Sequence, residues 1–294
     1  MTTLLNKPTK LLKPKKLKSK QKYRSLWVDL GAILVVVIVF LLPLSFILIN
    51  ASKSSHDAFL LNFHLPKKWV FWDNFKEAWA TQDHVIWRAT VTTLLITVLS
   101  VTVLIVISGM AGYYLQRAKT KLAGVGQFAV LSALIAPPAL VPTIWVMQKL
   151  HIYASLLGIV LIEVTYGMAF AVLLFRNFMA TIPKELDEAA IMDGCEGWRL
   201  YFRIIFPLLR PVTLTIAIVT SVAVFNDFSN PLYFLPGSSH PTLQLTLFNF
   251  QSQYNTSWNL LFTDILYITF IPLMAFIFFN RKIVEGMTAG SVKG

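Results

Sequence analysis

The sequence predicts an all-α membrane protein with about six transmembrane helices. Its 294 residues are 56% hydrophobic and only 14% charged, with a mean hydropathy of +0.64, and a soluble domain of this size could not bury so much apolar surface. A helix needs about 20 mostly apolar residues to cross a hydrocarbon core of about 30 Å. Six runs approach that length: residues 30–50, 90–115, 126–150, 155–178, 208–235 and 260–280.

The basic residues predict how these spans are oriented, because Lys and Arg are retained on the cytoplasmic side of a membrane. With the N-terminus inside, the cytoplasmic segments hold 20 of the 26 Lys and Arg residues and the extracytoplasmic segments hold 6. An even number of spans returns the C-terminus to the cytoplasm. We therefore expect a basic cytoplasmic tail over residues 1–29, one membrane domain over residues 30–281 and a cytoplasmic tail over residues 282–294.

The formal net charge of +12 is explained by this topology. The Lys-rich tail precedes a span and would face anionic lipid, so we expect no nucleic-acid partner. A signal peptide is the alternative reading of the tail and the first run, but the run that begins at Leu30 is too long for one. The single cysteine, Cys195, can form no intrachain disulfide, and no metal or redox site is suggested.

Between the spans, two extracytoplasmic loops and one proline pair stand out. Residues 51–89 are rich in aromatic side chains, as expected at a membrane interface. Residues 236–259 lack Lys and Arg but carry many amides and hydroxyls, which suits either a polar partner or an ordinary solvated loop. In the third run, Pro137 and Pro138 predict a kink or a break, because proline lacks a backbone donor and clashes with the preceding turn.

The cytoplasmic stretch between the fourth and fifth runs, residues 182–207, is expected to form two short helices around a glycine turn. Pro183 and the acidic residues after it are typical of a helix start. Gly194 can adopt the left-handed conformation that ends a helix. Residues 196–206 then place apolar and aromatic side chains on one face, until Pro207 is expected to end the second helix.

This stretch resembles the permease subunits of binding-protein-dependent, ATP-driven importers. The family pattern is Glu-Ala-Ala, three residues, Gly, nine residues, then Ile-x-Leu-Pro. The chain matches it, with Phe206 in place of the usual Leu, at Glu188, Ala189, Ala190, Gly194, Ile204 and Pro207. Further similarity to the carbohydrate-uptake branch, near the shorter subunit of the maltose permease, lies in Ile182-Pro183, Asn226-Asp227-Phe228 and residues 281–294. The resemblance covers residues 30–294.

The resemblance implies a type I ABC importer permease fold in the plasma membrane of a prokaryote. It also implies that residues 182–207, hereafter the coupling loop, carry a coupling helix seated in a groove of an ATPase subunit. The residues assigned to this contact are Pro183, Glu188, Ala189, Ala190, Asp193, Gly194, Ile204 and Pro207. The implied partners are a second homologous permease subunit, two ATPase subunits and an extracytoplasmic solute-binding protein.

The chain itself is not expected to be an enzyme or to hold a cofactor. It has no Gly-x-x-x-x-Gly-Lys-Ser/Thr phosphate loop, so ATP and Mg²⁺ would be bound by the partner ATPase. ATP binding would move the coupling helices and switch the cavity from outward-facing to inward-facing, as the resemblance implies.

Three acids within the spans are candidates for the substrate pathway, because a carboxylate inside a membrane is costly and is retained for function by default. They are Glu163, Asp227 and Asp264, and their expected company is Asn226, Tyr166 and Trp145. Carboxylates and amides can hydrogen-bond sugar hydroxyls, and aromatic faces can cover sugar C–H surfaces. Asp264 could instead cap the sixth helix, and Glu163 could pair with a base of another subunit or stay protonated.

Two other functions compete with sugar import. A cation or peptide importer of the same architecture would share the coupling loop. A secondary transporter driven by an ion gradient could use Glu163 or Asp227 as a proton site, but the lack of an inverted repeat and the presence of the coupling loop argue against it.

Overall fold

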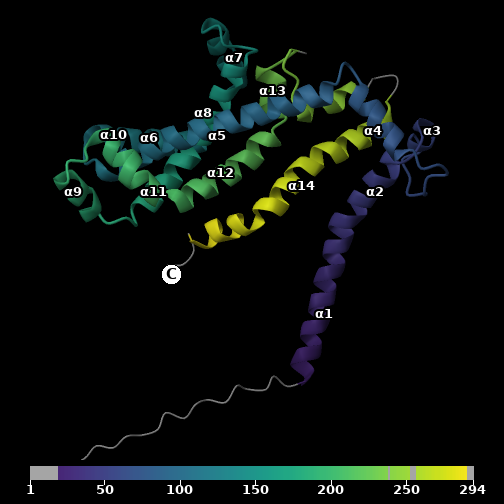
Figure 1. The fold of residues 1–294 in the computed structure, drawn as a ribbon, viewed down its shortest axis with the longest axis horizontal. Coiled ribbons are helices and arrows are strands. Elements are labelled where there is room, and N and C mark those ends of the chain that lie inside the picture. The colour runs from purple at the N-terminus through teal and green to yellow at the C-terminus, as the bar shows by residue number, and fades with distance from the viewer. Residues whose placement is uncertain (1–18, 238, 252–255, 290–294) are drawn as a thin grey trace, which may run out of the picture.

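The computed structural model describes residues 19–237, 239–251 and 256–289, and all regular structure in these ranges is helical (Figure 1), which confirms the all-α prediction. Residues 1–18 of the predicted N-terminal tail and residues 290–294 lie outside the described residues. The elements are α1 (Ser19–Val36), the π-helix η1 (Val37–Leu41), α2 (Leu42–Ala51), α3 (Ser55–Ala58), α4 (Phe71–Ala80), α5 (Val85–Arg117), α6 (Lys121–Ile135), α7 (Leu140–Lys149), α8 (Leu156–Met179), α9 (Glu185–Met192), α10 (Gly197–Leu200), the π-helix η2 (Tyr201–Ile205), α11 (Phe206–Leu208), α12 (Arg210–Phe225), α13 (Ser229–Phe234), the 3₁₀-helix η3 (Leu243–Asn249) and α14 (Trp258–Ala289).

Four helices of the described chain are long and apolar enough to cross a membrane. They are Val28–Ala51, α5, α8 and the Trp258–Phe278 part of α14, and they match the first, second, fourth and sixth predicted spans. The fifth predicted span corresponds to α12 and α13, and α12 forms a bent pair with the helix before it, Gly197–Leu208, at an angle of 77°. Counting that pair as one span gives five.

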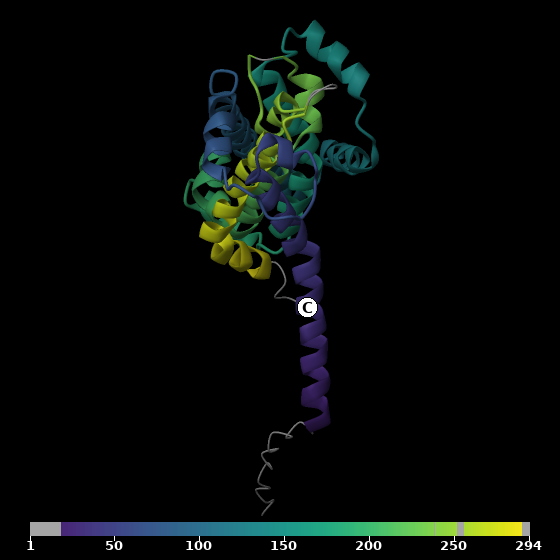
Figure 2. The same ribbon diagram turned by 90° about the vertical axis from the view of Figure 1, so that its right-hand side faces the viewer.

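The third predicted span is two helices, and the break falls at Pro137 and Pro138. α6 ends at Ile135 and α7 starts at Leu140, so neither helix reaches the length of a span. Ala136 has an extended backbone (φ −69°, ψ 126°), as expected of a residue before proline. Figures 1 and 2 show α7 projecting from the helical body beyond this break.

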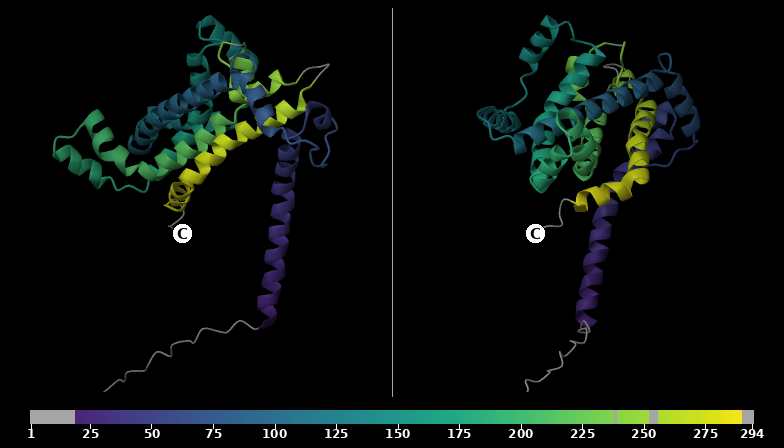
Figure 3. Two further views of the ribbon diagram at one scale, coloured as in Figure 1. Left: turned by 45° about the vertical axis from the view of Figure 1, so that its right-hand side comes forward. Right: turned by 60° about the vertical axis from the view of Figure 1, so that its left-hand side comes forward.

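α5 is the central helix of the fold. It packs most extensively against α8 and also contacts α12, which in turn lies along α14 (Figures 1 and 3). The α5–α8 contact depends on Gly112, because a Cβ there would lie 2.7 Å from Cβ of Phe175. α5 runs from α4 at one end of the molecule to α9 at the other (Figure 1).

Near the α4 end, residues 51–89, predicted as an aromatic-rich segment at the membrane interface, include α3, α4 and a buried polar cluster. Lys53 is 2% exposed, and its Nζ donates hydrogen bonds to Asn50 Oδ1 at 3.0 Å, Asn62 O at 2.6 Å and Asn62 Oδ1 at 2.9 Å. Burial lowers the pKa of the Lys53 ammonium, and the nearby Asp57 carboxylate opposes that shift. The three acceptors match the three protons of a lysine ammonium, so this buried lysine is fully satisfied.

The same cluster ties α14 to α2 and α4. Asn74 Nδ2 donates to Ala51 O and to Lys53 O, each at 2.8 Å. Asn259 Nδ2, near the start of α14, donates to Asn74 Oδ1 at 2.8 Å. These side chains are buried and separated by up to 185 positions in the sequence, so they fix the order of the helices at this end.

By contrast, the first apolar helix is not covered by the rest of the chain. None of its most apolar window, within Val28–Ala51, is buried, and Figures 1, 2 and 3 show α1 standing away from the other helices. Such an uncovered apolar helix is what a hydrocarbon environment tolerates and water does not.

Candidate functional site

The first half of the coupling loop is α9, closed by a glycine turn. Glu185, Asp187 and Glu188 lie in the first turn, where they favour the positive end of the helix dipole. At the other end Gly194 has a φ of +77°. Gly194 N donates to Ile191 O and Cys195 N donates to Ala190 O, each at 2.9 Å, which is the hydrogen-bond pattern of a Schellman motif. The turn therefore has the conformation that the sequence predicts.

The second half ends at Leu208, one residue after Pro207, close to the end that the sequence predicts. α10, η2 and α11 follow one another without a break, and the chain bends after Leu208. Pro207 lies in the last turn of the continuous helix Gly197–Leu208, just before the bend. The buried side chains of Tyr201 and Ile205 pack in the core formed with α5, α8 and α12, so this half anchors the coupling loop.

In the first half, α9 is a helix with one buried side. Ala190 is buried, whereas Glu188, Ala189, Asp193 and Gly194 are exposed. Apolar side chains are exposed beside them: Leu186 by 44%, Ile191 by 46% and Met192 by 87%. In the second half, Ile204 is half-buried and Pro207 is exposed, as is Pro183 before α9. The motif thus presents small, acidic and apolar side chains on one uncovered surface.

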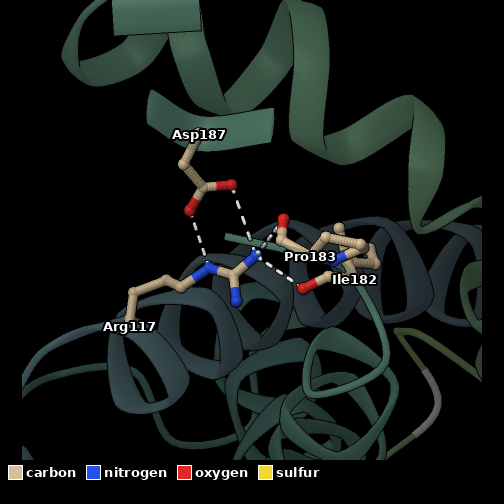
Figure 4. A network of polar contacts seen from close by, with 4 residues as sticks. All are labelled: Arg117, Ile182, Pro183 and Asp187. Atoms are coloured by element: carbon tan, nitrogen blue, oxygen red, sulfur yellow. Dashed lines mark hydrogen bonds and ion pairs between the residues drawn. The ribbon is translucent and has the colours of Figure 1, made fainter. Parts of the chain in front are cut away.

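An ion pair fastens α9 to the end of α5 (Figure 4). Arg117 Nε donates to Asp187 Oδ2 at 2.6 Å, and Arg117 Nη2 donates to Asp187 Oδ1 at 3.3 Å. The same Nη2 donates to the carbonyls of Ile182 at 3.1 Å and Pro183 at 3.4 Å. Sequence reasoning missed both partners. The available signal was an arginine at the end of a span and an acid directly before the family motif.

Of the three intramembrane acids, Glu163 and Asp227 come together. Glu163, in α8, is 7% exposed and accepts a hydrogen bond from Asn230 Nδ2 at 3.1 Å. Asp227 neighbours Glu163, and its Oδ1 accepts from Ser229 N at 2.8 Å and Asn230 N at 3.2 Å. Asn230, which sequence reasoning missed, therefore joins both carboxylates. We call Glu163, Asp227 and Asn230 the acid–amide cluster.

The aromatic and amide residues expected beside the acids are divided. The hydroxyl of Tyr166 is buried near Thr143 and Glu163, so Tyr166 belongs with the acid–amide cluster. Trp145, on α7, is 62% exposed. Asn226 is exposed, and its Nδ2 donates back to Val222 O at 2.9 Å. Of the three residues expected beside the acids, Tyr166 is therefore the one whose side chain lies near Glu163.

Asp264 belongs to a different contact network. Its side chain is fully buried, and its Oδ2 accepts a hydrogen bond from Thr246 Oγ1 at 2.7 Å. That contact joins α14 to η3 and does not cap α14, which begins at Trp258. Leu243 N, also in η3, donates to Thr93 Oγ1 at 2.9 Å. Asp264 thus joins α14 to η3 through Oδ2, while its buried Oδ1 has no hydrogen-bond partner among the described residues.

The chain is similar to membrane components of known transport systems. The family model described as a binding-protein-dependent transport system inner membrane component matches residues 108–286. A probable starch degradation products transport system permease protein of Thermoanaerobacterium thermosulfurigenes is 33% identical over 263 residues, which cover 88% of this chain and 94% of that protein. A melibiose/raffinose/stachyose import permease protein of Bacillus subtilis is 28% identical over 88% of this chain and 94% of its own length.

The fold is also shared with a solved structure. A chain of a bacterial ABC transporter involved in the import of the acidic polysaccharide alginate superposes with a TM-score of 0.76 at 18% identity, covering 92% of this chain and 99% of that one. The matched family region contains α9 and the glycine turn as well as the acid–amide cluster. The chain is a multi-pass membrane protein and belongs to the family of binding-protein-dependent transport system inner membrane components.

Proposed function

We propose that this chain is the transmembrane subunit of an ATP-driven importer that moves a sugar or oligosaccharide from an extracytoplasmic binding protein into the cytoplasm. The observation that carries the proposal is the coupling loop. It presents an eight-residue helix, α9, with the uncovered apolar side chains of Leu186, Ile191 and Met192. Exposed apolar side chains at the family motif are typical of a surface that binds a partner protein.

The partner on α9 is a separate ATPase subunit that binds ATP and Mg²⁺. The chain lacks a Gly-x-x-x-x-Gly-Lys-Ser/Thr phosphate loop, so its own residues supply no cradle for nucleotide phosphates. The complete importer contains two such ATPases, a second homologous permease subunit and the binding protein. The ATPase cycle moves the α9 helices and switches the pathway between its two openings, with both termini on the cytoplasmic side.

Sugar is the substrate class that the relatives favour. Two of them are named for starch degradation products and for melibiose, raffinose and stachyose. The acid–amide cluster supports the same class, because a carboxylate accepts and an amide donates hydrogen bonds with hydroxyl groups. Glu163, Asp227 and Asn230 supply both kinds of group at one place between α8 and α13.

The test is uptake by the reconstituted complex. The chain, the second permease and the ATPase are placed in proteoliposomes, and uptake of radiolabelled maltooligosaccharides and raffinose-type sugars is measured with and without the binding protein. We expect uptake only when ATP and the binding protein are both present. Uptake by the chain alone under a proton or sodium gradient would instead establish an ion-driven transporter and refute the proposal.

A further inference from the structure

Arg117 makes four hydrogen bonds to the start of the coupling loop, all from the Nε and Nη2 atoms on one edge of its guanidinium group. Nε and Nη2 hold the two oxygens of Asp187, and Nη2 also reaches the carbonyls of Ile182 and Pro183. The Arg117 and Asp187 side chains are each only 12% exposed. A planar fork held on a carboxylate in this way sets the orientation as well as the distance of its partner.

This contact connects two parts of the chain that are 70 positions apart. Arg117 is the last residue of α5, and Asp187 lies in the first turn of α9. α5 is the helix that packs on α8, which carries Glu163, and on α12, which leads to Asp227 and α13. The ion pair therefore gives α9 a direct link to the central helix, in addition to its covalent links to α8 and α10.

Stability alone gives a weak reason for this arrangement. Partly buried ion pairs lose hydration that their attraction often only offsets, and an apolar pair of similar volume would hold the helices together as well. Control of geometry is a better reason, because an apolar contact permits sliding and a two-point hydrogen-bonded pair does not. The contact is also placed beside the uncovered face of α9 and not within it, since Asp187 is buried.

We propose that Arg117 is a positioning residue for energy coupling: its guanidinium locks the first turn of α9 to the end of α5, so that a displacement of α9 moves α5 with it. This inference rests on the proposed function, because it takes α9 as the helix that an ATPase moves. It assigns no contact between Arg117 and either substrate or nucleotide.

The experiment is a double-mutant cycle read as sugar transported per ATP hydrolysed. The reconstituted importer carries Arg117→Ala, Asp187→Ala or both, and the ratio is compared with that of the unmodified complex. We expect each single substitution to lower the ratio roughly fivefold to tenfold, within the range of typical allosteric coupling. The double variant should be no worse than the worse single variant, because both changes remove the same link. Arg117→Lys should give an intermediate ratio, since lysine keeps the charge but loses the fork.

Lys119→Ala is the matched control, because Lys119 is basic, exposed and two residues away. It should leave the ratio unchanged. A ratio that stays normal in Arg117→Ala, or losses that multiply in the double variant, would overturn the inference. If the alanine variants do not assemble, the same double-mutant cycle is measured with the milder substitutions Arg117→Lys and Asp187→Asn.

A second readout separates this inference from the proposed function. Hydrogen exchange of the α9 amides is measured on the unmodified chain and on Arg117→Ala in lipid nanodiscs, without partners. Faster exchange across residues 185–192 in the variant supports the lock even if no sugar is transported. Failure of the unmodified complex to transport sugar overturns the proposed function, whereas unchanged exchange and an unchanged ratio in an active complex overturn only the role of Arg117.

Discussion

Asn230 Nδ2 donates a hydrogen bond to Glu163 Oε1 across 3.1 Å, and it joins α8 to α13 within the membrane domain. The two residues are 67 positions apart, and the same asparagine presents its backbone N–H to Asp227. One asparagine therefore holds two carboxyl groups in a fixed relation. The hydrogen bonds from Asn230 therefore account for the two neighbouring carboxyl groups without a bound cation.

The first prediction concerns Glu163 as a substrate contact. Glu163→Gln keeps the shape of the side chain but replaces one carboxyl oxygen with an amide nitrogen, and leaving a buried hydrogen-bonding group unpaired costs about 1–3 kcal/mol. We expect sugar uptake by the reconstituted importer to fall by about tenfold or more, with ATP hydrolysis retained. Uptake and hydrolysis are measured in the same vesicles.

The control for this substitution is Thr165→Val, which changes an exposed residue on the same helix whose hydroxyl bonds only back to Leu161 O at 2.7 Å. It should leave sugar uptake near that of the unmodified chain. Equal uptake in Glu163→Gln would show that the carboxylate serves packing between α8 and α13 and not the substrate.

Much of the fold could be predicted because hydropathy reports directly on membrane crossing. Four predicted spans are continuous helices, and the break in the third falls at Pro137 and Pro138, where the sequence indicates it. Hydropathy does not report the direction in which the helices before and after this break run. It could not show that α7 turns away from the helical body after the break (Figure 2).

The candidate site could be predicted only in part, because a sequence gives depth along a helix and not direction around it. Glu163, Asp227 and Asp264 all lie within predicted spans, yet Asp264 turns toward Thr246 and joins another network. The conformation of a local turn is easier to predict from sequence, and Gly194 has the left-handed backbone expected of it. The pairing of Arg117 with Asp187 has no local signature, because 70 positions separate the partners.

A second prediction tests the close approach of α5 and α8 at Gly112. A Cβ there would lie 2.7 Å from Phe175 Cβ and 3.0 Å from the backbone nitrogen of Arg176, so the helices would have to separate. We expect Gly112→Ala to lower the free energy of unfolding by about 1–3 kcal/mol, the usual cost of overpacking. The change is measured as a lower thermal midpoint of the purified chain in detergent.

Gly124→Ala is the control for that measurement. Gly124 lies in α6, where no atom lies within 4 Å of the position that a Cβ would take, and alanine favours a helix over glycine by up to about 1 kcal/mol. Its thermal midpoint should stay the same or rise. If the thermal midpoint were equally low in both variants, the loss of stability would come from replacing any glycine and not from a clash at Gly112.

The third prediction concerns the buried ammonium of Lys53. Lys53→Met keeps the length of the side chain but removes the donor to Asn50 Oδ1, whereas the Asn62 oxygens keep their hydrogen bonds from Asn50 Nδ2 and His64 N. Leaving a buried acceptor unpaired costs about 1–3 kcal/mol. We expect a lower thermal midpoint and earlier proteolysis within residues 51–80, whereas Lys67→Met, at an exposed position, should change neither. Normal stability of Lys53→Met would mean that Asn74 and Asn259 hold this end unaided.

The last prediction uses the left-handed backbone at Gly194. No atom lies within 4 Å of a Cβ at this position, so a substitution acts through backbone strain and not through a clash. A β-branched residue is a poor fit to a φ of +77°, at a cost of about 1–3 kcal/mol, whereas asparagine tolerates that region best among non-glycine residues. Gly194→Val should therefore insert into the membrane but lose sugar transport and its coupling to ATP hydrolysis, and Gly194→Asn should retain most of both. Membrane insertion, uptake and hydrolysis are measured for each variant. Intact transport in vesicles that contain Gly194→Val would refute the assignment of α9 as the helix that the ATPase contacts.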